Sequence, residues 1–454
     1  MLGLNKVRFL GSHYLSSLSL TLSIVFPTIS WASLIKSQER PEFYFKDLAS
    51  ALRGFEENAS TLVVENYDVD IADANLDLAK SEKGFRVGLN ISGQSVYEDR
   101  PNESFYHHYR TFNQVYLRKP LFHWGALKSK EKIAFLLKEQ AENHLFYRKR
   151  AIKGQIRAVF LEMVVLKYKI LVTSEQIKLA QENSDIIREK LDLGLYSPIQ
   201  LDESISNHLR LKISLSQHET KFSEKSSLFT RLSGFKYRSE LDIPNDFWNF
   251  VLSEKIQKDL PIQIGKLNAS ELNNLRAQLS IESENVRIAE AELKPKINFM
   301  TAYYKDQIDL ANSGQSIDRN NFVAGIEANW ALWDSHQSKS QKEAALARKS
   351  KVDHLINLKI RELNDYRDSL RKELLSLMDR IELSRKLLTL SKKRLEKGSI
   401  ELNLNRINRS QHFSLVLALN EAKLMNLEVV SRYLILLDQY DLLVNSVTSY
   451  ETLK

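Results

Sequence analysis

The sequence of 454 residues contains no cysteine, and it is poor in glycine (14) and proline (8). The lack of cysteine excludes disulfides, thiolate metal sites and attachment of a lipid to an N-terminal cysteine. Scarce glycine and proline leave long stretches in which nothing breaks a helix. With 43% hydrophobic and 27% charged residues, the chain is also too polar on average for a bundle of membrane helices. We therefore expect long helices in a large, mostly water-exposed protein.

Recognised catalytic motifs are also missing. The sequence contains no Gly-rich phosphate loop, no His-Glu-x-x-His motif and no serine nucleophile elbow. We place the adjacent His107 and His108 in a polar loop between strands, and two ligands are too few for a metal site. The acidic residues placed in loops of the same kind, where solvation explains them, are Asp99, Glu103, Asp306 and Asp309. We therefore expect no enzyme, no cofactor and no metal.

The N-terminus, residues 1–32, has the pattern of a secretory signal peptide. Lys6 and Arg8 supply positive charge ahead of an apolar run, and the tripeptide Ser-Trp-Ala at 30–32 forms a small-x-small cleavage site. An uncleaved membrane anchor is the alternative, but the apolar run is shorter than the roughly 20 residues that a span needs. An exported chain rarely meets nucleic acid, so we ascribe the net charge of +8 to solvated helix surfaces.

An internal repeat organises the chain, with a constant offset of 211 residues over its strand regions. Residues 84–97 match the region that starts at 295, and residues 117–125 match residues 328–336. Each half reads as helix, strand, loop, strand, very long helix, turn and long helix. The predicted organisation is a signal peptide (1–32), an N-terminal helical segment (33–83), repeat 1 (84–234), an inter-repeat segment (235–272), repeat 2 (273–447) and a C-terminal tail (448–454).

Four segments alternate polar and apolar residues with a period of two, which is typical of a sheet with unlike faces. The predicted apolar face comprises Val87, Leu89, Ile91, Ile297, Phe299, Tyr303, Phe322, Ala324, Ile326, Ala328 and Trp330, and the polar face includes Arg86, Asn90, Ser92, Lys296, Asn298, Asn321 and Glu327. The second segment, 111–117, alternates poorly and is assigned by the repeat. Each segment has about the 9 to 11 residues of a tilted membrane strand. Aromatic residues expected near the strand ends, as in girdles at a membrane interface, are Tyr97, Tyr116, Trp124, Tyr304, Trp330 and Trp333.

Four strands cannot close a barrel around a useful lumen, since about 8 are needed merely to fill the interior with side chains. Other subunits would have to complete the barrel. We therefore predict a mostly α-helical chain that contributes its strands to a membrane β-barrel shared between subunits. The alternative is a small sheet packed on the helices.

Between Ala126 and Leu193 the only helix breaker is Gly154, so one helix could reach roughly 100 Å at 1.5 Å per residue. Apolar or small residues recur at steps of three and four, which predicts a coiled-coil seam. The seam positions are Val159, Met163, Leu166, Ile170, Thr173, Ile177, Ala180, Ser184, Ile187 and Leu191 in the first half, and Leu370, Leu374, Leu377, Ile381, Ser384, Leu388, Ser391 and Leu395 in the second.

Gly194 and Gly398 are predicted to mark the reversals of two helical hairpins, because glycine accepts positive φ. Their offset is 204 residues, seven less than 211, and seven residues are one heptad. Either the returning helix of the second half is one heptad longer, or the second reversal lies one heptad beyond Gly398.

With this order of elements, the chain resembles the TolC-type outer membrane efflux family over nearly all of its length after the signal peptide. The family's strand-end motif Pro-Leu-Phe-Asp-Gly is matched by Pro120, Leu121, Phe122, His123 and Gly125, with His123 in place of the acid. In the second half only Leu332, Trp333 and Asp334 match this motif. The family's proline between helix and strand is matched by Pro295 in the second half, whereas the first half has Gly84 at that position. The family's hydrophobic-Gly-hydrophobic turn is matched by Leu193, Gly194 and Leu195, and its second copy by Lys397, Gly398 and Ser399.

The resemblance implies a homotrimer whose protomers form one 12-strand β-barrel, continuous with a periplasmic α-helical barrel. It also implies that the turns at 193–195 and 397–399 dock on a periplasmic adaptor (membrane fusion) protein, and that an inner-membrane pump supplies the substrates. The chain would then be the exit duct of a tripartite efflux or type I secretion system. It would lie in the cell outer membrane, in contact with outer-membrane lipid, and extend far into the periplasm.

Members of the family carry aspartates just beyond the second turn, whereas residues 402–410 contain no acid here. The candidates for a gate at the inner mouth are therefore Asn403, Asn405, Arg406, Asn408 and Arg409. The alternative places both arginines on the outer surface, paired with acids such as Glu203 or Glu401.

Two rival functions remain open. A periplasmic adaptor also carries helical hairpins, but normally one hairpin flanked by glycine-rich β modules. A helical scaffold without a pore would leave the apolar strand faces unexplained.

Overall fold

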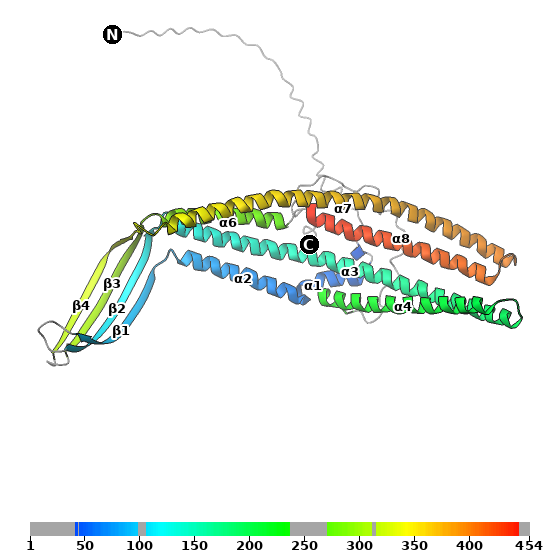
Figure 1. Ribbon diagram of the computed structural model, residues 1–454, viewed down its shortest axis with the longest axis horizontal. Helices are drawn as coiled ribbons and strands as arrows, with labels where there is room; N and C mark the ends of the chain where they lie inside the picture. The colour runs from blue at the N-terminus through cyan, green and yellow to red at the C-terminus, as the bar shows by residue number, and fades with distance from the viewer. Residues whose placement is uncertain (1–40, 44, 99–105, 237–269, 311–314, 445–454) are drawn as a thin grey trace, which may run out of the picture.

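The computed structural model describes residues 41–43, 45–98, 106–236, 270–310 and 315–444 (Figure 1). The predicted signal peptide, nearly all of the inter-repeat segment, the C-terminal tail, Asp99 and Glu103 lie outside the described residues. The elements are η2 (Pro41–Phe43), α1 (Lys46–Asn58), α2 (Ser60–Ser81), β1 (Arg86–Glu98), β2 (Tyr106–Phe122), α3 (Ala126–Asp192), α4 (Pro198–Ser233), α6 (Ser270–Glu292), β3 (Lys296–Leu310), β4 (Gln315–Asn329), α7 (Gln337–Asn403) and α8 (Arg409–Val444). Among the described helices, none combines the length and the apolar character that a membrane span requires.

The repeat is regular throughout both helical hairpins. Helices α3 and α7 each contain 67 residues, and the returning helices α4 and α8 each contain 36. Every start and end in the second hairpin lies 211 residues beyond its counterpart in the first. The expectation of a returning helix one heptad longer is therefore wrong, and the alternative, a second reversal beyond Gly398, is correct.

The four strands form one antiparallel sheet in the order β1-β2-β3-β4. Its register places the predicted apolar residues in rows on one face, because Leu89 pairs with Val115, Val115 with Tyr303, and Tyr303 with Phe322. The alternation read from the sequence is thus confirmed. Since side chains have a period of two, the polar residues between these positions share the other face.

The strands are longer than the predicted 9 to 11 residues. They contain 13, 17, 15 and 15 residues, because backbone pairing continues beyond the apolar rows into polar sequence. His107 and His108 lie in β2, and Asp306 and Asp309 lie in β3, so their placement in loops is wrong.

Each strand continues into one helix of a curved wall, as Figure 1 shows. Near the sheet the helices lie in the order α2, α3, α6, α7, while farther away α4 continues the lane of α2, and α8 that of α6. Both hairpin tips lie at the end opposite the sheet. The largest core forms midway along the wall, where α1 packs on the long helices and buries Phe45, Phe160, Phe229 and Tyr433. Gly154 interrupts nothing in α3, which runs unbroken to Asp192.

The predicted seams are largely confirmed. Seven of the seam residues in the second half are buried, from Leu370 to Ser391, and in the first half Val159, Met163, Leu166, Ile170, Thr173, Ala180 and Ser184 are buried. The remaining seam positions, Ile177, Ile187, Leu191 and Leu395, are partly buried. Steps of three and four therefore identified the packed face of both hairpins.

Candidate functional site

The sheet has one face that a soluble protein would not leave uncovered. The side chains of Leu89, Phe322 and Ile326 are 65%, 72% and 71% exposed, although they stand side by side with other apolar residues. A contiguous exposed apolar surface of this kind indicates contact with a partner or with lipid.

The opposite face is polar and carries ion pairs between strands. The Arg110 guanidinium donates from Nε and Nη2 to the two carboxylate oxygens of Asp306, each at 2.9 Å. Arg118 on β2 reaches across β3 to Glu327 on β4 at 2.7 Å. The first pair joins neighbouring strands and the second joins strands on either side of β3, and together they leave a hydrophilic surface that suits a water-filled interior.

A close approach on the polar face explains Gly88. The Tyr116 ring lies directly over this glycine, where an added Cβ would come within 2.4 Å of the ring. Tyr116 and Tyr304 therefore sit within the strands on the polar face, and their assignment to an aromatic girdle is wrong. Trp124 and Trp330 do lie at the helical end of the sheet, where their indole N–H groups donate to the carbonyls of Pro295 and Leu293.

The two strand-to-helix junctions use the same backbone. Consecutive residues in the left-handed region precede each long helix: Trp124 and Gly125 (φ 53° and 86°) in the first repeat, Ser335 and His336 (φ 53° and 68°) in the second. The predicted strand-end motif therefore marks these two sharp junctions.

The first hairpin tip reverses through Gly194 (φ 71°). The N–H of Leu195 donates to the carbonyl of Lys190, and that of Gly194 to Leu191, which closes α3 with a Schellman motif. Ser197 and Gln200 then form a reciprocal capping box that starts α4 at Pro198. The predicted first reversal is confirmed.

The second tip repeats this geometry with other residues. Asn405 (φ 55°) takes the place of Gly194, and the N–H of Arg406 donates to the carbonyl of Glu401. Asn408 and Gln411 form the second reciprocal cap, in which Gln411 N donates to Asn408 Oδ1 at 2.7 Å and Asn408 N to Gln411 Oε1 at 3.0 Å. Asn405 suits the position because asparagine accepts the left-handed region better than most residues.

The placement of the second turn at Lys397, Gly398 and Ser399 is wrong. These residues belong to α7, and Gly398 is buried against α8, where an added Cβ would lie 2.2 Å from Leu415 Cδ1. Gly398 thus permits close helix packing and does not reverse the chain. The signals that identify the true turn are the constant offset of 211 and the Asn-x-x-Gln cap at Asn408 and Gln411, which matches the Ser-x-x-Gln cap of the first hairpin.

The gate candidates therefore lie in the tip of the second hairpin itself. Asn403 ends α7, Arg409 begins α8, and Asn405, Arg406 and Asn408 form the reversal between them. All five are exposed. Among the described residues, neither arginine forms an ion pair with Glu203, with Glu401 or with any other acid. At the first tip the exposed residues include Leu193, Leu195 and Ile199, whereas the second tip exposes Leu404 beside its arginines and amides. The first tip is therefore the more apolar, and the second is basic and rich in amides.

Within the described part of the chain, no group of three or more His, Asp or Glu side chains is arranged to hold a metal ion. His107 stacks on Tyr97 with ring centroids 4.3 Å apart, and its Nε2 lies 2.9 Å from Ser95 Oγ. These contacts make His107 part of the surface of the sheet.

Comparison with known proteins identifies the fold. No protein-family model matches the sequence, and no curated protein matches it. CusC, a protein described for its folding and transmembrane channel formation, superposes with a TM-score of 0.67 and 14% identity, covering 89% of this chain and 94% of CusC. The outer membrane protein VceC from Vibrio cholerae gives a TM-score of 0.66 and 12% identity, covering 88% and 96%. The CmeC outer membrane channel from Campylobacter jejuni gives 0.64 and 10%, covering 96% and 93%. The chain therefore has the fold of these proteins, and the resemblance inferred from the sequence is confirmed at the level of the fold.

Proposed function

We propose that three copies of this chain form a duct through the outer membrane, which passes substrates from an inner-membrane pump and a periplasmic adaptor to the exterior. The observation that carries the proposal is the four-stranded sheet, with an exposed apolar face and two open edges, continuous with a long helical wall. The fold shared with outer membrane channels supports it. Both tripartite efflux and type I secretion fit this architecture.

The open edges favour assembly. In the described residues β1 pairs only with β2, and β4 only with β3. Unpaired backbone groups are not tolerated in lipid, so both edges need partners. Because successive strands alternate in direction, β1 of one copy can pair antiparallel with β4 of the next. Three copies would close a barrel of 12 strands, enough to surround a lumen.

The helical wall offers matching edges. Helix α2 contacts α3 on one side, and its other side carries the exposed Val64, Tyr67, Ile71 and Leu78 at helical spacing. Helix α7 borders the opposite edge and exposes Leu355, Leu358 and Tyr366. Burial of these stripes between neighbouring copies would stabilise a tube, since each buried apolar side chain contributes about 1.5 to 3 kcal/mol.

The tips, at the far end from the sheet, would be the inner end of the tube. We propose that the first tip docks on the adaptor through Leu193 and Leu195, beside the uncovered backbone of Gly194. The five gate candidates at the second tip would ring the inner mouth.

Gly194→Asp tests the docking role, because aspartate tolerates the left-handed conformation but adds charge to the apolar tip. We expect a correctly inserted trimer that no longer exports. Normal export by this variant would mean that Gly194 only terminates the helix.

The two rival functions make different predictions. An adaptor would remain with the periplasmic fraction, and a scaffold without a pore would not need lipid around its sheet. We expect the chain in the outer-membrane fraction, and a trimer by native mass spectrometry in detergent. A stable monomer in that membrane would contradict the proposal.

A further inference from the structure

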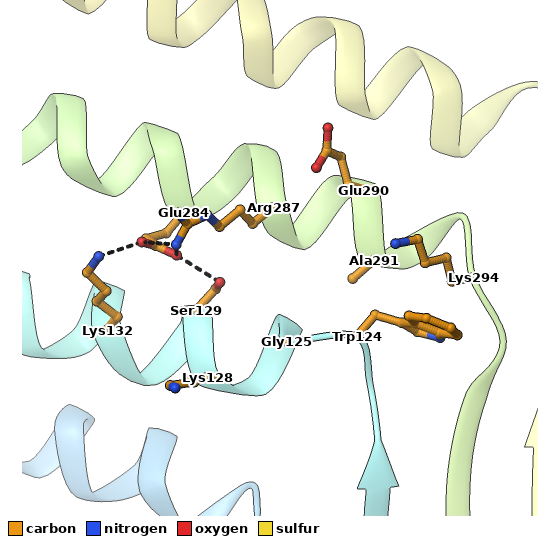
Figure 2. Close-up of a pocket in the computed structure, with 10 residues that line it drawn as sticks. All are labelled: Trp124, Gly125, Lys128, Ser129, Lys132, Glu284, Arg287, Glu290, Ala291 and Lys294. Atoms are coloured by element: carbon orange, nitrogen blue, oxygen red, sulfur yellow. Dashed lines mark hydrogen bonds and ion pairs between the residues drawn. The ribbon is translucent and has the colours of Figure 1, made fainter. Parts of the chain in front are cut away.

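A cavity of about 440 Å³ lies where the sheet meets the helical wall, between α3 and α6 (Figure 2). Trp124, Lys128 and Lys132 line it on the side of α3, and Arg287 and Lys294 on the side of α6. None of these residues has a part in the reversal of the hairpins or in the pairing of the sheet edges.

The cavity has an excess of positive charge. Glu284 accepts hydrogen bonds from both Lys132 (2.7 Å) and Arg287 (2.9 Å), so two cations share one carboxylate. Glu290, the other acid of the lining, pairs with Lys342 of α7 at 3.0 Å. The described residues contain no acidic partner for Lys128 or for Lys294, whose Nζ lies 4.8 Å from the centre of the Trp124 ring. Figure 2 shows this ammonium group above the indole.

The cavity opens on the same side of the wall as the apolar face of the sheet. The Trp124 ring contacts Phe122 at 4.7 Å between centroids, and Phe122 pairs with Ile297 of the apolar face. Lys294 follows the end of α6 at Glu292, and its ammonium group lies over the Trp124 ring. It therefore lies on the side of the wall that Trp124 and Phe122 occupy.

The second repeat provides an internal comparison. There, Asp334 accepts the backbone N–H of Ser338 at 2.9 Å and its hydroxyl at 2.5 Å, so a carboxylate covers the first turn of α7. The equivalent residue in the first repeat is His123, which contacts Asn298 at 2.8 Å instead, and α3 has no side-chain cap. The positive end of the α3 dipole thus adds to the charge of the cavity, and Glu284, which accepts from Ser129 at 2.8 Å, is already shared by Lys132 and Arg287.

We propose that this cavity binds the phosphate of a membrane phospholipid headgroup, whose acyl chains lie along the apolar face of the sheet. The assignment rests on the proposed function, because the junction lies at the periplasmic surface of the outer membrane only in that orientation. Tryptophan beside lysine is typical of such an interface, where the amine meets phosphate and the ring meets the acyl boundary. The cavity lies between α3 and α6, the two middle helices of the wall. Neighbouring copies that pair at the edges of the wall would therefore leave it open.

The test is lipid retention by the purified protein in native mass spectrometry. The double variant Lys128→Ala/Lys294→Ala is compared with wild type and with Lys178→Ala, an exposed lysine far along the same helix. Wild type and Lys178→Ala should retain phosphatidylglycerol, and the double variant should bind it about tenfold more weakly, as loss of a charge-assisted hydrogen bond predicts. Equal retention by all three proteins would overturn the proposal.

Two further ligands identify the chemistry. Diacylglycerol, which lacks the phosphate, should be retained no better by wild type than by the double variant. Inorganic phosphate should compete only at far higher concentration than the lipid. Diacylglycerol bound as tightly as phosphatidylglycerol, or phosphate competing at equal concentration, would overturn the lipid assignment. Channel conductance separates this result from the proposed function, because the double variant should conduct like wild type even when the lipid is lost.

Discussion

The first hairpin turns at Gly194 and the second at Asn405, and both residues occupy the left-handed region, with φ of 71° and 55°. The same Schellman hydrogen bonds close α3 and α7, and the same reciprocal caps open α4 and α8. The side chains around the two turns differ, since the first tip exposes Leu193 and Leu195 where the second exposes Leu404 and Arg406. Backbone hydrogen bonding therefore fixes the shape of the tip, and the exposed side chains are left to specify what each tip contacts.

In the sheet, substitutions at equivalent positions of the two repeats should have the same effect. Val115 and Ile326 occupy equivalent positions on the apolar face. Val115→Arg and Ile326→Arg should each impair assembly, because a cation on the lipid-facing side of a barrel costs up to about 2 to 4 kcal/mol, depending on its depth. The yield of trimer in the outer membrane measures the effect. Glu327→Gln, on the polar face of the same strand, is the matched control and should assemble normally, and equal loss in all three would contradict the assignment of the faces.

The hairpins differ in where they place a small residue. Gly398 packs against Leu415, whereas Ile187 and Ser204 stand at the equivalent positions of the first hairpin. Gly398→Ile should destabilise the second hairpin by about 1 to 3 kcal/mol through overpacking. The double variant Gly398→Ile/Leu415→Ser reproduces the arrangement of the first hairpin and should recover most of that loss. Chemical denaturation in detergent measures both, and additive losses would show that the two positions are not in contact.

A third contrast concerns two equivalent acids, Asp73 on α2 and Glu284 on α6. Burial opposes ionisation of Glu284, but hydrogen bonds from Lys132 and Ser129 and the charge of Arg287 outweigh it, so the pKa of Glu284 lies below its ordinary value. The Asp73 side chain is 51% exposed and contacts Lys138. Since a lowered folded pKa stabilises the fold above the unfolded value of 4.5, this contribution is lost as the pH falls below 4.5.

Glu284→Gln should therefore cost about 1 kcal/mol at pH 7, and the difference from wild type should vanish in acid. Asp73→Asn should have a smaller effect, because water screens its pair. Thermal unfolding at pH 7 and at pH 3 measures both variants. A difference for Glu284→Gln that persists in acid would show that the carboxylate charge is not the cause.

The smallest effect on stability, and the most specific effect on function, is expected at the second tip. Arg406→Glu and Arg409→Glu change exposed residues, so folding should be unaffected. If one arginine ring faces the lumen, threefold repetition of its charge should make the channel prefer anions, and each substitution should move the reversal potential towards cation preference. Leu195→Glu, at the position equivalent to Arg406, is the control. Unchanged selectivity in both arginine variants would place the arginines outside the mouth.

The spacing of apolar residues and the constant offset between the two repeats were enough to predict most of the fold. Alternation identified the face that carries Leu89 and Phe322, and steps of three and four identified the seam from Leu370 to Ser391. Gly398 was misread because a glycine in a sequence is equally compatible with a left-handed turn and with close packing of two helices. The constant offset points to Asn405, and following it through the turn would have placed the tip correctly.

The polar contacts could not be predicted from the sequence and are seen only in the structure. The strands extend through His108 and Asp306 because cross-strand pairing continues where apolar alternation stops, which no single strand reveals. The Arg110 to Asp306 pair joins residues 196 positions apart, and the cationic cavity joins α3 to α6. Contacts of this kind depend on register and on helix rotation, which sequence spacing alone does not fix.

The trimeric duct is tested most directly by single-channel recording of the purified protein in a planar lipid bilayer. Three copies that pool their strands should insert as one unit and produce discrete conductance steps of uniform size, and Ile326→Arg should reduce insertion. A protein that remains monomeric and produces no conductance steps would contradict the duct.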